Sequence, residues 1–122
     1  MNAIRKLLRS FAIGFTGLSH VFLSEQNMRI HALIAVCVIL AGFFFRLLIW
    51  EWVAVLLCIG LVISAECMNT ALERLADRVS LEEHPLIKQA KDCGSAAVLV
   101  LALTSAVIGL VIFVPKLWLL GR

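Results

Sequence analysis

Four polar residues, Glu66, Asn69, Glu73 and Asp77, follow an apolar segment at intervals of three, four and four residues. On an α-helix this spacing places all four side chains on one face, because residues three and four apart are neighbours on the helix surface. At a rise of ~1.5 Å per residue, Glu66 and Glu73 are about 10 Å apart along the axis. That separation is too large for one metal ion. It suits a carboxylate near the lipid that accepts a proton and a second one nearer water that binds Mg²⁺ and phosphate.

The position of Glu66 favours a functional interpretation of this stripe. Glu66 directly follows the apolar segment, where an ionisable side chain is costly and for that reason commonly functional. The structural alternative is that Asn69 and the carboxylates form hydrogen bonds between helices. The stripe alone leaves both interpretations open.

A second polar group precedes the last apolar segment. Lys91 and Ser95 are four residues apart and share a helix face, and Asp92 lies about 100° round from Lys91. A lysine at this place can bind phosphate as a point charge, although anchoring at the membrane surface explains it equally well. Glu25 precedes the first apolar segment and can complete a site that faces Glu73. No P-loop, protein-kinase glycine loop or dinucleotide fingerprint occurs.

The composition indicates a membrane protein. Of the 122 residues, 62% are hydrophobic and 16% are charged, whereas a soluble domain has about 45–50% apolar and about 25% charged residues. The mean hydropathy is +1.03. A soluble domain this small buries only about two-thirds of its surface, so the bilayer must cover the rest. The length predicts a single domain, and nucleic acid is not expected as a partner.

Three apolar segments are predicted to cross the membrane, since a crossing needs about 20 residues. They are residues 29–49, residues 51–79 and residues 88–115. The second segment is expected to leave the membrane in its C-terminal half. The third is expected to end at Pro115, because proline interrupts the helical hydrogen-bond pattern.

Residues 4–23 predict an amphipathic helix that lies at the membrane surface. Apolar residues recur there at helical spacing, while Arg5, Lys6 and Arg9 lie off the apolar stripe. The same stripe also suits packing on the other helices. The predicted fold is therefore an all-α membrane protein with one interfacial helix and three crossings.

Lysine and arginine counts predict the orientation. Eight basic residues flank the N-terminal side and the second loop, and three lie on the opposite side. The eight are Arg5, Lys6, Arg9, Arg29, Arg74, Arg78, Lys88 and Lys91, and the three are Arg46, Lys116 and Arg122. The excess of basic residues places the N-terminus and the second loop in the cytoplasm and the C-terminus outside.

Two segments carry a resemblance to a known family. The run ECMNTALERLAD from Glu66 to Asp77, followed by AKDCGSAAV at residues 90–98, resembles the signature of the bacterial diacylglycerol kinase and undecaprenol kinase family. The resemblance covers nearly the whole chain and includes Glu25. The run EQNMRIH from Glu25 to His31 and the HPL run at residues 84–86 are more similar to the undecaprenol kinase branch.

This resemblance implies a homotrimer in the bacterial cytoplasmic (inner) membrane that phosphorylates a lipid alcohol with MgATP at sites shared between subunits. It implies that Glu66 is the general base and that Glu25 and Glu73 bind Mg²⁺. It also implies a nucleotide and phosphate site lined by Asn69, Asp77, Lys91 and Asp92, with Ser95, Arg5, Lys6, Arg9 and Arg29 as further candidates.

Two alternatives remain at this stage. Undecaprenol is the favoured alcohol, with diacylglycerol as the alternative, because nothing in the physical chemistry of the residues separates them. An oligomeric transporter with Glu66 as an intramembrane ion or proton site is a second alternative, but it gives no role to Lys91 and the other carboxylates.

Overall fold

The computed structural model describes residues 2–122 as four α-helices joined by short loops. They are α1 (Ala3–Ser24), α2 (Gln26–Phe44), α3 (Ile49–Val79) and α4 (Pro85–Leu120). All four are long and apolar enough to cross a membrane, as judged from length and composition. The prediction of an all-α membrane protein is confirmed. Length and composition do not distinguish α1, which is predicted to lie at the membrane surface, from the three helices that are predicted to cross.

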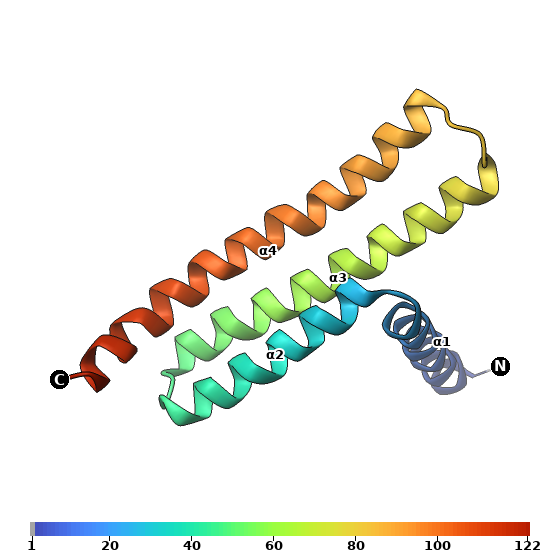
Figure 1. The fold of residues 1–122 in the computed structure, drawn as a ribbon. Helices are drawn as coiled ribbons and strands as arrows, with labels where there is room; N and C mark the ends of the chain where they lie inside the picture. Colours follow the sequence, from blue (N-terminus) through green and yellow to red (C-terminus); the bar gives the residue numbers. More distant parts are fainter. Residues whose placement is uncertain (1) are drawn as a thin grey trace.

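Helices α2, α3 and α4 lie side by side, and consecutive helices run in opposite directions (Figure 1). Helix α1 leaves this bundle at a steep angle beside the first turn of α2 (Figure 1). The hairpin of α3 and α4 continues past the beginning of α2, and residues 80–84 join its two helices. The polar stripe therefore lies on the part of α3 where the three-helix bundle becomes a two-helix hairpin.

Local sequence signals fix where two of the helices begin. The Oδ1 atom of Asn2 accepts a hydrogen bond from the backbone N–H of Arg5 at 2.9 Å, which satisfies one free donor of the first turn of α1. The Nδ1 atom of His84 accepts from the N–H of Leu86 at 3.1 Å, and Pro85 occupies the first helical position of α4. Helix α4 therefore begins at Pro85, before residue 88, where the third crossing is predicted to begin.

The predicted end of the third crossing is wrong, because α4 continues through Pro115 to Leu120. Proline removes one backbone hydrogen bond, a loss that neighbouring helices can offset in apolar surroundings. Lys116 follows directly, and its Nζ lies 3.0 Å from Oε1 of Glu51 at the beginning of α3. This buried ion pair holds the turn after the proline against α3. The first predicted crossing also reaches too far, since α2 ends at Phe44.

The loop between α2 and α3 folds over a small apolar core. Leu47, Val55 and Ile112 are buried together at this end of the bundle, and Trp52 packs against them. The ring of Trp52 also lies against Gly42, where a Cβ atom would be 2.6 Å from Cη2 of the indole. Glycine at position 42 therefore permits the close approach of α2 and α3.

Helix α2 ends in a Schellman motif with an arginine where glycine is usual. The N–H of Leu47 donates to the carbonyl of Gly42 at 3.1 Å, and the N–H of Arg46 donates to that of Phe43 at 3.3 Å. Arg46 has a φ of 53°, in the left-handed region. A side chain with a Cβ atom is strained there.

Replacing Arg46 by glycine should stabilise the protein. We expect Arg46→Gly to exceed Arg46→Ala in the free energy of unfolding by about 1 kcal/mol, because both remove the charge and only glycine removes the strain. Thermal unfolding of the purified protein in detergent measures the difference. Equal melting temperatures for the two variants would contradict the assigned backbone strain.

Candidate active site

The polar stripe of α3 runs from a buried end to an exposed end. Glu66 is only 3% exposed, Asn69 and Glu73 are half-buried, and Asp77 is exposed. The change follows the geometry of the fold, because α2 and α4 both cover α3 near Glu66 while only α4 accompanies it near Asp77 (Figure 1). The stripe thus connects the interior of the bundle with its polar end.

His31 of α2 is the side chain that meets Glu66. Its Nε2 atom lies 3.2 Å from Oε1 of Glu66, and the imidazole is 21% exposed. The two atoms are within ion-pair distance, but their alignment does not make a hydrogen bond, so Oε1 remains a buried acceptor without a donor among residues 2–122. The contact joins the second turn of α2 to the middle of α3.

Two further carboxylates belong to the predicted site. Glu25 lies at the junction of α1 and α2, where its backbone N–H donates to the carbonyl of Val21 at 2.9 Å. Glu73 lies two turns from Glu66 on the same stripe of α3 and receives a hydrogen bond from Asn69. That Glu25 and Glu73 complete one site remains a prediction.

Asn69 sits against a glycine of α4. Its Nδ2 atom donates to Oε1 of Glu73 at 3.4 Å, and its Oδ1 atom is buried without a donor in the described part of the chain. A Cβ atom at Gly94 would overlap that Oδ1 atom. Gly94 therefore lets α4 approach α3 closely enough to enclose the amide.

The structure joins Lys91 to the stripe and leaves Asp92 outside it. Lys91 of α4 forms an ion pair with Asp77 of α3. Asp92 instead pairs with Lys88 on its own helix at 2.7 Å, and both side chains are largely exposed. Ser95 is exposed. Of these two pairs, the pair of Lys91 with Asp77 is the one that joins α3 to α4.

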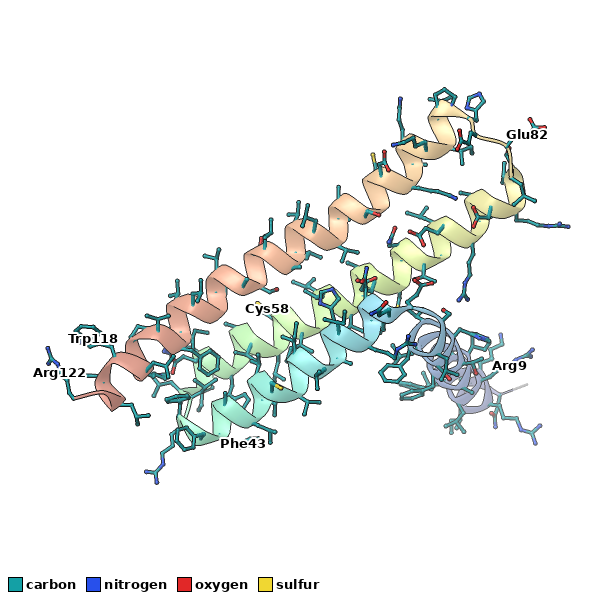
Figure 2. All side chains as sticks on the ribbon, in the orientation of Figure 1. Arg9, Phe43, Cys58, Glu82, Trp118 and Arg122 are labelled. Atoms are coloured by element: carbon teal, nitrogen blue, oxygen red, sulfur yellow. The ribbon has the colours of Figure 1, made fainter. Side chains whose placement is uncertain are left out.

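The basic residues near α1 have two different environments. Arg5, Lys6 and Arg9 are exposed on the first turns of α1, and Arg9 points away from the bundle (Figure 2). Arg29 donates from Nη1 to the carbonyls of Phe22 and Leu23 at 3.2 and 3.0 Å, so it caps the end of α1. The guanidinium of Arg29 therefore fixes the junction of α1 and α2, where Glu25 lies.

An apolar cavity of about 260 Å³ lies between α2, α3 and α4. It extends along α3 from Ile63 to Val55, and its lining is apolar except for a few groups that include His31 and Ser105. His31 thus borders the cavity and also contacts Glu66. A narrow apolar molecule in the cavity would have one end beside the carboxylate.

Among the described residues, no group of three histidine, cysteine or acidic side chains is close enough to hold a metal ion by itself. The donor chemistry nevertheless fits a hard cation, because the stripe carries carboxylates and, among the described residues, Oε1 of Glu66 and Oδ1 of Asn69 are buried without donors. Mg²⁺ is usually bound by one or two carboxylates together with phosphate oxygens and water. The arrangement is compatible with such a shared site.

Sequence reasoning assigned no role to His31 or Gly94, and the structure places both at the stripe. The signal for Gly94 is weak, since a glycine inside a helical pattern indicates a close approach without naming its partner. A lone histidine at the start of an apolar segment gives no sign of a contact with a residue of another helix.

The chain resembles known proteins over most of its length. The family model described as prokaryotic diacylglycerol kinase matches residues 12–113. The chain is 40% identical over 116 residues to an undecaprenol kinase of Bacillus subtilis, covering 95% of this chain and 94% of that protein. It is 37% identical over 112 residues to a diacylglycerol kinase of Synechocystis, covering 91% and 64% of the two chains. A diacylglycerol kinase of Pseudomonas aeruginosa is 36% identical over 96 residues, covering 79% and 78%.

The contact between Gly94 and Asn69 predicts a specific sensitivity. Gly94→Ala should lower the free energy of unfolding by about 1–3 kcal/mol, because its methyl group has no space in the packed interface. Gly109→Ala is the matched control on α4, since a Cβ atom there would have no neighbour within 4 Å. Thermal unfolding of both variants tests the packing, and an equal effect of the two would contradict it.

Proposed function

This chain belongs to the prokaryotic diacylglycerol kinase family and is a lipid kinase; we propose that it transfers the γ-phosphate of ATP to a lipid alcohol, with Glu66 as the base. The observation that carries this assignment is the burial of Glu66 at the inner end of the polar stripe, in contact with His31, which lines the apolar cavity. Because this family consists of lipid kinases, the alternative that the chain is a transporter is set aside.

The reaction needs little covalent chemistry from the protein. The hydroxyl oxygen of the lipid attacks the γ-phosphorus, its proton passes to the Glu66 carboxylate, and the bond to the β-phosphate oxygen breaks to release ADP. Phosphoryl transfer depends mainly on positioning and on stabilising charge. Glu66 is buried where a lipid hydroxyl can reach it without leaving the membrane boundary.

Glu25 and Glu73 are the proposed ligands of Mg²⁺, which when bound neutralises charge on the nucleotide phosphates. Asn69 donates to Glu73 and so orients it. Their positions at the junction and on the second half of the stripe leave Glu66 free to act as the base.

The nucleotide and phosphate site is proposed to include Asn69, Asp77, Lys91 and Asp92. Lys91 is held by Asp77, so its charge is kept at the end of the stripe that water reaches. Ser95 follows on the same face of α4 as Lys91. The proposed outer phosphate contacts are Arg5, Lys6, Arg9 and Arg29. Arg29 would have to divide its hydrogen bonds between the phosphate and the carbonyls of α1.

Undecaprenol is the proposed lipid alcohol, with diacylglycerol as the alternative. The support is the undecaprenol kinase of Bacillus subtilis, which matches 95% of this chain. The cavity bordered by His31 is mainly apolar and runs along α3, which suits a hydrocarbon or isoprenoid chain.

We propose that α1 lies along the cytoplasmic face of the inner membrane and that α2, α3 and α4 cross it. The steep angle of α1 and its exposed basic residues support this arrangement (Figure 1). It also places the loop of residues 80–84 in the cytoplasm, where Glu82 extends from the end of the hairpin (Figure 2). A homotrimer is proposed from the family resemblance, and it would provide further cover for the stripe. Cross-linking in detergent tests the number of subunits.

Glu66→Gln should assemble normally and lose turnover by about 10²–10⁴-fold, since it keeps the shape of the side chain but removes the base. The purified protein is assayed with labelled ATP and with undecaprenol or diacylglycerol, and the labelled lipid is identified. The better substrate decides between the two alcohols. Retention of most of the kcat by Glu66→Gln would show that Glu66 is structural.

Glu25→Gln and Glu73→Gln should raise the Mg²⁺ concentration that gives half-maximal activity, because hard cations prefer charged oxygen ligands. Glu73→Asp is the matched control that keeps a carboxylate, and it should need less Mg²⁺ than Glu73→Gln. A Mg²⁺ titration of each variant at saturating ATP provides the measurement. Unchanged titrations in both glutamine variants would refute their assignment as ligands.

A further inference from the structure

His31 lies where three features of the site meet. It belongs to α2, its Nε2 atom is 3.2 Å from Oε1 of Glu66 on α3, and it borders the apolar cavity between α2, α3 and α4. Within residues 2–122 it is the one basic side chain at ion-pair distance from Glu66. None of the roles proposed above involves it.

The surroundings of Glu66 make such a partner necessary. The carboxylate is buried, and its Oε1 atom has no hydrogen-bond donor within residues 2–122. A buried carboxylate without a donor is costly, and it can rotate until it finds one. A general base, however, must keep one oxygen directed at the hydroxyl from which it takes the proton.

We propose that His31 is a positioning residue for the Glu66 base and that its imidazole holds Oε1 so that Oε2 accepts the proton of the lipid hydroxyl. The inference rests on the proposed role of Glu66. The proton of the alcohol passes to Glu66, and His31 keeps its own throughout. The distance of 3.2 Å shortens into an aligned hydrogen bond when substrate closes the site, because such contacts are commonly loose without ligand.

The position of His31 beside the cavity also affects how the lipid hydroxyl reaches Glu66. An apolar chain in the cavity would bring its hydroxyl end past the imidazole before the hydroxyl reaches Glu66. The imidazole therefore separates the apolar cavity from the carboxylate. A purely structural contact between α2 and α3 would need neither this location nor a free Oε2.

The test compares three variants of the full-length protein in lipid-containing detergent micelles. His31→Leu removes the donor, His31→Gln keeps one, and His20→Leu is the control at an exposed histidine of α1. We expect His31→Leu to lower kcat by about 10–100-fold, as loss of an orienting partner commonly does, with little change in KM for ATP or lipid. His31→Gln should recover most of the kcat, and His20→Leu should match the unmodified protein.

A double variant separates failure of this inference from failure of the proposed function. His31→Leu should cause no further loss in the Glu66→Gln background, because the two residues act as one unit. If Glu66→Gln is inactive while His31→Leu keeps full kcat, the positioning role is refuted and the base stands. If Glu66→Gln itself is active, both are refuted.

Poor folding of His31→Leu does not remove the test, since His31→Ala can be assayed with added imidazole. The cavity beside position 31 offers space for the free ring. A rise in kcat with imidazole, absent in the unmodified protein and in His20→Leu, supports the positioning role. No rise, together with no recovery in His31→Gln, would show that His31 only joins α2 to α3.

Discussion

Burial of a carboxylate at the boundary of an apolar helix bundle is unfavourable unless neighbouring groups compensate for the lost water. Glu66 is in this position, and its nearest partner is the imidazole of His31. Within residues 2–122 its Oε1 atom accepts no hydrogen bond. The bundle must therefore hold His31 and Glu66 together against the cost of burying the carboxylate.

That restraint comes from the pairing of α3 with α4. The ion pair of Glu51 with Lys116 joins the helices at one end of the hairpin, and that of Asp77 with Lys91 joins them near the other. Between the two pairs, Gly94 admits the side chain of Asn69. Because a shift of one helical turn would break all three contacts, the register of α4 against α3 is strongly specified. This register sets the place of Lys91 relative to the stripe.

The sequence predicted the helical class, the four segments and the face shared by Glu66, Asn69, Glu73 and Asp77, since these follow from hydropathy and periodicity. It did not predict that α4 continues past Pro115, because the contact of Lys116 with Glu51 depends on tertiary packing. The contact of His31 with Glu66 was missed for the same reason. Periodicity describes one helix at a time, while both contacts depend on the register between helices.

The two halves of the proposed site are anchored in different ways. The stripe and Lys91 belong to the packed hairpin, whereas Glu25 lies at the junction with α1. That junction is held by Arg29 on the last carbonyls of α1 and by a hydrogen bond of 2.6 Å from Arg74 to Ser24. Most apolar side chains of α1 are exposed in the single chain, so their cover must come from lipid or from another copy. The position of Glu25 relative to Glu73 therefore depends on what covers α1.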